Sequence, residues 1–279
     1  MKRIKSLIFL ILLSLSLLSC KRTAKDEAVS LTPKPFTLTV YDALKGDAFL
    51  ISSGDFNMMI DCGYKKTAPL ILSDLKDRNI KSIDLMIISH FDKDHVGGAP
   101  KILEGIEVKR IITTRKTNDD KRTEKFFEAL RENGLKNEVC EADIDIEAPG
   151  FKISIRPPER KQYPDSEDNN SSLFVRTESP YGTLLFTGDA ESIRMDEILS
   201  YKDLGCDLLK IPHHGRDTYG LKELIERSTP GIALITSSVE EPSDSGVLKI
   251  LKDQGVTYYD TAECGSFEII FDEKGIRKK

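Results

Sequence analysis

Two histidines and two aspartates lie within six residues of one another, directly after an apolar run. The run Leu85 to Ile88 leads into Ser89-His90-Phe91-Asp92-Lys93-Asp94-His95-Val96-Gly97-Gly98. A strand that ends in a tight loop can turn all four polar side chains toward one point. Neutral imidazole nitrogens and ionised carboxylate oxygens are the ligands that divalent first-row cations bind. The spacing therefore predicts a metal site formed by His90, Asp92, Asp94 and His95, and disfavours a loop whose charges are merely solvated.

Two further clusters of ligand type follow strand-like runs later in the chain. They are Thr187-Gly188-Asp189 and His213-His214-Gly215. Either cluster alone is a weak signal, but together with the first loop they account for all four histidines of the chain. We therefore expect segments that are far apart in the sequence to meet at one metal centre.

The first loop resembles the H-x-H-x-D-H signature of the metallo-β-lactamase superfamily, with Asp92 in place of the second histidine. An H-x-D-x-D-H-x-G-G loop is similar to that of the hydrolase domain of ComEC-type competence proteins. Val40 to Ala48, Met59 to Gly63 and Asp168 to Leu173 resemble, in order, that family's entry strand, its I-D-x-G motif and its N-N-x-S-L segment. The resemblance covers about residues 36 to 272 and does not extend to the membrane channel of those proteins.

This resemblance implies a single α/β domain of the αββα sandwich type, with two sheets face to face and helices outside. It also implies two divalent metal ions. His90 and Asp92 would bind the first ion, Asp94 and His95 would bind the second, and Asp189 would bridge both. One imidazole of the adjacent histidine pair would complete the second ion's ligands.

We favour His214 as that ligand and His213 as a catalytic donor to a substrate oxygen, although the order of the two stays open. Where many relatives carry another ligand histidine, this chain has Asn169 and Asn170, whose amide oxygens are weaker and harder donors. Asp61 would lie behind the ligands and orient one of the histidines through its ring N–H.

The expected donor set is rich in oxygen and contains no thiolate. Such a set favours Mn²⁺ or another hard ion over Zn²⁺, compared with a site made mainly of imidazoles. Two ions roughly 3.5–4 Å apart lower the pKa of a bridging water toward about 7 and clamp the oxygens of the group under attack. We therefore expect a hydrolase, with Asp94 and His213 as its catalytic side chains, that acts on phosphodiesters through metal-activated hydroxide.

The substrate is less certain than the chemistry, because the same machinery opens lactone and β-lactam rings. The ComEC-type relatives carry an N-x-x-G-H-P turn after the strand Ile232 to Thr236, and this chain has Ser237 to Asp244 there instead. A lactonase or β-lactamase-like hydrolase is the first alternative. A surface lipoprotein that binds metal without turnover is the second.

The N-terminus has the features of a bacterial export signal. Lys2, Arg3 and Lys5 precede an apolar run that is too short to span a membrane. Leu17-Leu18-Ser19-Cys20 resembles a lipobox, which implies a signal peptide over residues 1–19 and lipid attachment at Cys20. Residues 20–35 would tether the domain to the lipid. We expect an exported lipoprotein, periplasmic or at the cell surface, that contacts the membrane through its lipid and has no transmembrane segment after signal removal.

The chain is acidic, with a formal net charge of −5, and loses further positive charge with its signal. A large nucleic-acid footprint normally appears as a basic face. The only basic candidate is the segment 109–136, where acidic residues interrupt the cluster, and we interpret it as a solvated amphipathic helix with its flanking loop. The expected partner is a phosphodiester or a nucleic-acid fragment.

Short apolar runs alternate with helix-length segments along the domain. The last expected strand ends near Phe271, and residues 273–279 are expected to be a C-terminal tail. Cys62, Cys140, Cys206 and Cys264 could pair in three ways or stay free. The expected strands cover approximately 36–41, 48–52, 56–60, 85–89, 110–113, 151–156, 173–177, 183–187, 207–211, 232–236, 256–259 and 267–271.

Overall fold

The computed structural model describes residues 34–279. The expected signal peptide, the lipid attachment at Cys20 and most of the tether lie outside the described residues, so these expectations stay predictions. No helix within the described part of the chain combines the length and the apolar character that a membrane span requires.

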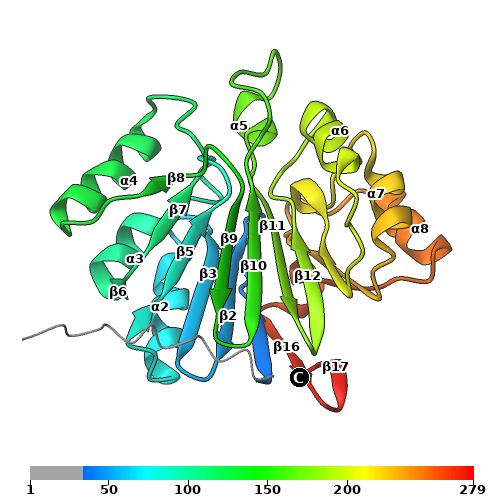
Figure 1. The fold of residues 1–279 in the computed structure, drawn as a ribbon, viewed down its shortest axis with the longest axis horizontal. Coiled ribbons are helices and arrows are strands. Elements are labelled where there is room, and N and C mark those ends of the chain that lie inside the picture. Colours follow the sequence, from blue (N-terminus) through cyan, green and yellow to red (C-terminus); the bar gives the residue numbers. More distant parts are fainter. Residues whose placement is uncertain (1–33) are drawn as a thin grey trace, which may run out of the picture.

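One sheet combines the two ends of the described chain, because the C-terminal strands return beside the first one (Figure 1). Phe36 pairs with Phe271 across this junction. The strands are antiparallel on this side and parallel from β3 onward. The strand order is β17 (Gly275–Lys278), β16 (Phe267–Asp272), β1 (Phe36–Val40), β2 (Ala48–Ser53), β3 (Phe56–Cys62), β5 (Leu85–Ile88), β7 (Ile111–Thr113) and β8 (Glu138–Val139).

The second sheet is built from the middle of the chain and is parallel from β12 to β15. Its order is β15 (Thr257–Asp260), β14 (Ile232–Ile235), β13 (Leu208–Lys210), β12 (Gly182–Phe186), β11 (Phe174–Ser179), β10 (Phe151–Arg156) and β9 (Ile144–Ala148). Two short strands, β4 (Ser82–Ile83) and β6 (Glu107–Val108), pair separately.

The two sheets pack face to face, because alternate residues of each strand are apolar on the inner side. In β1, Leu38 and Val40 join the core between the sheets, whereas Tyr41, directly after the strand, packs with the helices outside. One outer face is covered by α2 (Ala68–Asp77), α3 (Ala99–Gly105) and α4 (Lys121–Glu132), and the other by α6 (Ser192–Ser200), α7 (Leu221–Ser228) and α8 (Ser245–Asp253). This arrangement confirms the predicted αββα sandwich.

Helix α4 confirms the amphipathic interpretation of the segment 109–136. Its buried residues Thr123, Phe126, Ala129 and Leu130 recur every three to four positions and face the sheet. The Asp120 carboxylate begins the helix by accepting hydrogen bonds from the backbone N–H groups of the second and third residues after it. The polar face of α4 is therefore left to solvent and to its neighbour α3.

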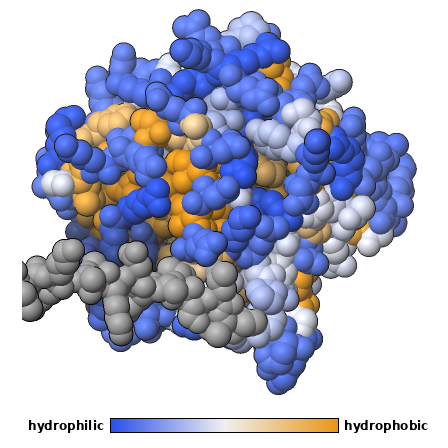
Figure 2. All heavy atoms as spheres, viewed as in Figure 1, coloured by the Kyte–Doolittle hydropathy of each residue, from blue (hydrophilic) through white to orange (hydrophobic). Residues whose placement is uncertain are grey.

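Several features differ from the expectations, including the short strands β4, β6 and β8, which were not predicted. Residues 273–279 are not a tail, because Gly275–Lys278 forms β17 and pairs with β16. Strand β9 was missed, since its alternation of isoleucines with acidic residues leaves it only half-buried. Cys62, Cys140, Cys206 and Cys264 are free thiols. On the face shown in Figure 2, hydrophilic residues dominate, and hydrophobic residues gather mainly over the central strands.

Candidate metal centre

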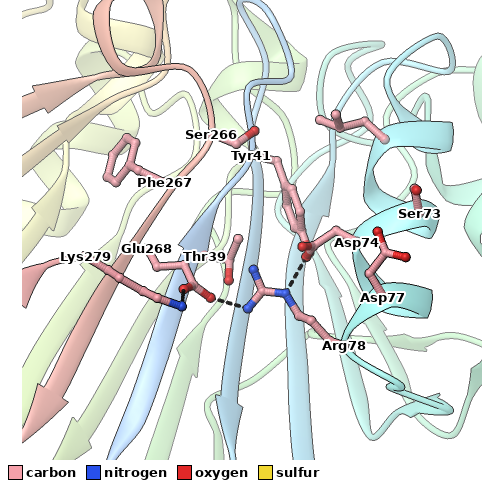
Figure 3. Close-up of a pocket in the computed structure, with 11 residues that line it drawn as sticks. Thr39, Tyr41, Ser73, Asp74, Asp77, Arg78, Ser266, Phe267, Glu268 and Lys279 are labelled. Atoms are coloured by element: carbon pink, nitrogen blue, oxygen red, sulfur yellow. Dashed lines mark hydrogen bonds and ion pairs between the residues drawn. The ribbon is translucent and has the colours of Figure 1, made fainter.

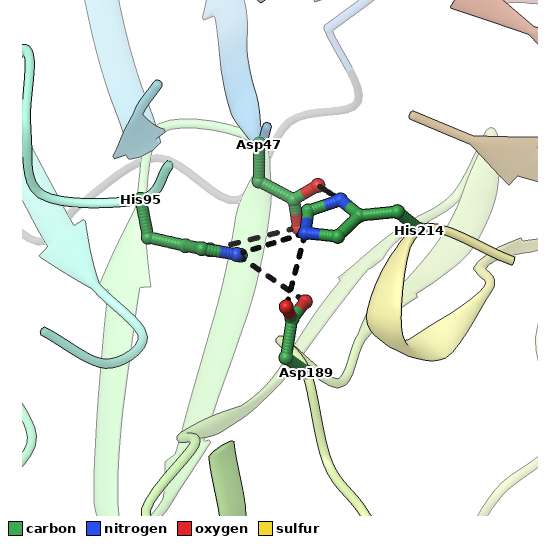
Figure 4. A group of neighbouring side chains, drawn as sticks. All are labelled: Asp47, His95, Asp189 and His214. Atoms are coloured by element: carbon green, nitrogen blue, oxygen red, sulfur yellow. Dashed lines mark hydrogen bonds and ion pairs between the residues drawn. The ribbon is translucent and has the colours of Figure 1, made fainter. Parts of the chain in front are cut away.

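Four side chains from four separate segments converge at one end of the sandwich (Figure 4). Asp47 precedes β2, His95 follows β5, Asp189 follows β12, and His214 follows β13. All four are buried, and one candidate ligand atom from each lies within 4.8 Å of the others. The carboxyl ends of the parallel strands β5, β12 and β13 therefore create the centre, as in other open α/β sheets.

The distances among these atoms fit a bound cation. His95 Nε2 lies 3.2 Å from Asp189 Oδ1, and His214 Nε2 lies 3.0 Å from Asp189 Oδ2. The two Nε2 atoms are 3.4 Å apart, and Asp94 Oδ2 is 3.5 Å from His214 Nε2. Ligands about 2.0–2.2 Å from one metal ion are separated by about this much. His95, His214, Asp189 and Asp94 can thus hold one ion.

Carboxylates behind the two imidazoles fix which ring nitrogen faces the centre. Asp61 Oδ2 lies 2.8 Å from His95 Nδ1. Behind His214, the Thr236 hydroxyl donates its proton to Asp47 Oδ1 at 2.6 Å. The same hydroxyl oxygen lies 3.0 Å from His214 Nδ1 and can therefore only accept a hydrogen bond from that nitrogen. In their neutral forms, both histidines therefore carry their proton on Nδ1 and present the Nε2 lone pair to the centre.

The backbone is held in an uncommon conformation at the same residues. Asp61, His213 and His214 all have positive φ, at 56°, 48° and 56°. For residues with a Cβ this conformation costs roughly 1–2 kcal/mol each, and such strain concentrates at functional sites. This conformation places Asp61 behind His95 and turns His214 toward the centre.

The loop after β5 also depends on glycine. A Cβ on Gly98 would lie 2.1 Å from the carbonyl oxygen of Cys62, and one on Gly97 would lie 2.2 Å from that of Lys93. These close approaches let the loop turn back onto β3, where the Cys62 N–H donates to the His95 carbonyl at 2.7 Å. The two glycines of the motif therefore position His95.

His90 and Asp92 form a second pair of candidate ligands. His90 is fully buried, its ring centroid lies 3.9 Å from that of His95, and its Nε2 has no hydrogen-bond partner among the described residues. Asp92 Oδ2 lies 3.8 Å from this nitrogen. A buried nitrogen without a partner is costly, so this atom is suited to a cation.

The two asparagines have different positions. Asn170 is used within the protein, since its Oδ1 accepts from the backbone N–H of Arg194 and its Nδ2 donates to the Asp165 carbonyl. The structure therefore gives no support to Asn170 as a ligand. Asn169 donates to Glu191 at 2.7 Å, and its Oδ1 is buried without a partner in the described chain, so it stays a candidate.

His213 points away from the buried cluster. Its Nδ1 lies 3.4 Å from Glu191 Oε1, and its side chain is 22% exposed, whereas that of His214 is 1% exposed. Burial lowers the pKa of His213, so the ring is neutral near pH 7. Of the two adjacent histidines, His214 thus faces the other ligands, and His213 is the one that is partly exposed to solvent.

Sequence reasoning missed Asp47 and Lys210. Lys210 is fully buried, with its Nζ 2.7 Å from Asp47 Oδ2 and 3.4 Å from Asp189 Oδ1. Burial alone lowers the pKa of Lys210, but the two carboxylates outweigh it and raise the pKa, so the amine is charged. A lysine within the apolar run from Leu208 to Ile211 was the signal that could have revealed it.

The buried side chains of the centre carry a net negative charge. Asp47, Asp61, Asp94 and Asp189 are buried, and Lys210 is the single buried amine among them. In the absence of metal, protons fill the gap: burial by itself lowers the pKa of His214, but Asp189, Asp47 and Asp94 raise it to about 10. Buried carboxylates in such excess are stable only when paired, and divalent ions supply that pairing.

The fold and this centre define a class of metal-dependent hydrolases. The chain belongs to the metallo-β-lactamase superfamily, whose family model (Metallo-beta-lactamase superfamily) matches residues 41–237. The solved metallo-β-lactamase fold protein YhfI from Bacillus subtilis has a TM-score of 0.56 and 16% identity, and the alignment covers 84% of this chain and 99% of that one. The comparison with YhfI shows the fold alone.

Curated relatives include competence proteins, which confirms the resemblance. ComE operon protein 3 of Bacillus subtilis is 27% identical over 200 residues, which are 70% of this chain and 25% of that protein. Recombination protein 2 of Haemophilus influenzae is 28% identical over 161 residues, 57% of this chain and 18% of that protein. The chain therefore matches only about a quarter or less of these relatives.

Proposed function

We propose that this protein is an exported, lipid-anchored enzyme that hydrolyses phosphodiesters with two divalent ions. The observation that supports it most directly is the excess of carboxylates over cationic side chains in the buried centre. Four buried aspartates and the partly exposed Asp92 contribute five carboxylates to the centre, and Lys210 is the single buried amine among them. Five carboxylates and one ammonium carry a net charge of −4, which two divalent cations would neutralise.

The ligands divide into two groups in this proposal. Asp94, His95, Asp189 and His214 hold one ion, while His90 and Asp92, with Asp189 and the Asn169 amide oxygen, hold the other. When bound, two such ions activate water and neutralise charge that builds on the oxygens around phosphorus. An oxygen-rich set favours Mn²⁺ or another hard ion over Zn²⁺.

Asp94 and His213 have separate roles in the proposed reaction. The Asp94 side chain is 10% exposed, compared with 3% for Asp189, so it can orient the attacking water from the solvent side of the centre. Burial raises the pKa of Asp94, but His214 and His95 hold it at about 2, which keeps the carboxylate ionised. The neutral ring of His213 can donate an N–H to a non-bridging oxygen of the substrate.

The comparison that tests this proposal uses two chromogenic substrates, bis(p-nitrophenyl) phosphate and a cephalosporin. We expect metal-dependent hydrolysis of the phosphodiester, lost by at least a hundredfold in Asp94→Asn and unchanged in the exposed control Asp253→Asn. Hydrolysis of the cephalosporin alone would support the lactonase or β-lactamase-like alternative. Bound metal without either activity would support a binding lipoprotein.

A further inference from the structure

The side chain of Asn169 is held in one orientation by a carboxylate. Asn169 lies in α5 (Glu167–Asn170), shortly before β11, and β11 pairs antiparallel with β12. This short helix therefore lies at the same end of the sandwich as Asp189, which follows β12 (Figure 1). Asn169 Nδ2 donates to Glu191 Oε1 at 2.7 Å. Because an ionised carboxylate only accepts hydrogen bonds, the amide turns its nitrogen toward Glu191 and its oxygen away from it.

The amide oxygen of Asn169 is buried and has no partner in the described chain. Asn169 Oδ1 accepts no hydrogen bond from residues 34–279. The neighbouring Asn170 differs, because both ends of its amide are hydrogen-bonded within the protein. A buried acceptor that is left unpaired is costly, and an amide oxygen is a hard donor of the kind that divalent cations bind. This oxygen is therefore free to bind a cation.

The chain after α5 is anchored beside the ligands of the ion that we assign to His90 and Asp92. Ser172 Oγ accepts the backbone N–H of Asp189 at 3.0 Å and lies 3.4 Å from Nδ1 of His90. His90 Nε2, in the same ring, also has no partner among the described residues. Two buried atoms that suit a cation, this nitrogen and the Asn169 oxygen, thus lie on segments that Ser172 connects.

Glu191 connects α5 with the loop that carries Asp189. It follows Asp189 by two residues, and its Oε2 accepts from the Ser166 hydroxyl at 2.5 Å. His213 Nδ1 lies 3.4 Å from Glu191 Oε1, which is longer than the hydrogen-bond range of about 2.7–3.2 Å. The Asn169 amide, at 2.7 Å, is therefore the group that this oxygen holds.

The groups that Glu191 binds are neutral. Among residues 34–279, no lysine or arginine forms an ion pair with its carboxylate. In the cavity between β1, α2 and β16, by contrast, Glu268 binds both Arg78 and Lys279 (Figure 3). The hydrogen bonds of Glu191 therefore orient an amide and a hydroxyl and do not neutralise a cationic side chain.

We propose that Glu191 is a positioning residue that presents the Asn169 amide oxygen to the ion held by His90 and Asp92. This inference rests on the proposed function, which assigns two ions to the centre. An amide rotated by half a turn would offer its NH₂ group instead, which donates hydrogen bonds and binds no cation. The orientation that Glu191 sets therefore decides whether this ion gains an oxygen ligand from α5.

Replacing Glu191 should weaken the binding of one ion selectively. In Glu191→Ala the amide of Asn169 can rotate, so we expect the affinity for one of the two ions to fall about 10–100-fold, with the other within about twofold of the parent. Titration of metal-free protein with Mn²⁺, followed by the EPR signal of the free ion, measures both affinities. Asp196→Ala removes the same charge from an exposed position of α6 and should change neither affinity.

Two further variants separate positioning from charge and from folding. Glu191→Gln lacks the charge but keeps an oxygen that can accept from Asn169 Nδ2, so it should retain most of the affinity. Asn169→Ala removes the ligand itself and should lose as much affinity as Glu191→Ala. Because Glu191 acts through Asn169 in this proposal, the double variant should bind no more weakly than either single variant.

The results that would overturn this role are specific. Equal losses in Glu191→Gln and Glu191→Ala would show that charge alone matters, and losses that add in the double variant would show that Glu191 does not act through Asn169. A parent that binds a single Mn²⁺ would also overturn it. A parent that binds two ions but does not hydrolyse bis(p-nitrophenyl) phosphate would instead reject the proposed function and leave the role of Glu191 intact.

Discussion

Lys210 places its ammonium group 2.7 Å from Asp47 Oδ2, in a site where neither side chain contacts bulk solvent. The same ammonium lies 3.4 Å from Asp189, the carboxylate between the two ligand imidazoles. Asp47 in turn fixes His214 through Thr236. One buried cation thus connects the metal ligands with the residues that orient them.

Replacing Lys210 should destabilise the protein strongly. Lys210→Met keeps much of the volume but leaves Asp47 and Asp189 without their cation, and removal of one partner from a buried pair costs about 3–5 kcal/mol. Chemical denaturation in EDTA should show this loss in the free energy of unfolding. Lys249→Met, on the surface of α8, should change it by less than about 0.5 kcal/mol. Similar losses in both variants would contradict this role for Lys210.

Asp61→Asn should weaken metal binding, because Asp61 Oδ2 is the acceptor for His95 Nδ1. Asparagine tolerates the positive φ of this position, so the change acts on the acceptor for His95 Nδ1. Loss of such an orienting carboxylate lowers metal affinity by about 10–100-fold. Competition with a metal-binding dye measures the affinity, and Asp55→Asn on a surface turn is the control. An unaltered affinity would show that Asp61 does not orient a ligand.

Metal binding should release protons. Without metal the pKa of His214 is raised to about 10, and that of His95 is also raised, so both rings are charged near pH 7.5. Metal requires their neutral forms, so about two protons should leave, as calorimetry in buffers of different ionisation enthalpy would show. Because the folded pKa exceeds the unfolded one, the metal-free protein should lose stability as pH rises from about 6.5 to 10. Buffer-independent heats would contradict this.

Gly98→Ala should disrupt the loop that carries the ligands. The added Cβ would meet the Cys62 carbonyl at 2.1 Å, so β3 or the loop must move. Overpacking of this kind costs about 1–3 kcal/mol, and displacement of His95 should reduce metal binding as well. Gly205→Ala, where no heavy atom lies within 4 Å of the new Cβ, is the matched control. Thermal unfolding and metal titration of both variants provide the comparison.

The sequence predicted those features that depend on residues close to one another along the chain. Buried strands such as Leu85–Ile88 are continuous apolar runs, and the candidate site residues Asp94 and His95, like His213 and His214, are adjacent in sequence. Strand β17 could not be predicted in this way, because its few residues are stabilised by pairing with β16 at a sheet edge. Lys210 and Asp47 escaped detection for a similar reason. Their roles depend on a contact between two residues that are 163 positions apart in the sequence. Only the packing of the two sheets brings these residues together.

The central claim is that the buried cluster holds two ions that serve phosphodiester hydrolysis. It is tested most directly by titrating metal-free protein with Mn²⁺ while following bis(p-nitrophenyl) phosphate. The account predicts that activity rises until about two ions are bound per chain, and that Asp189→Asn neither binds both ions nor turns over. Full activity in EDTA, or turnover by Asp189→Asn equal to that of the parent, would contradict it.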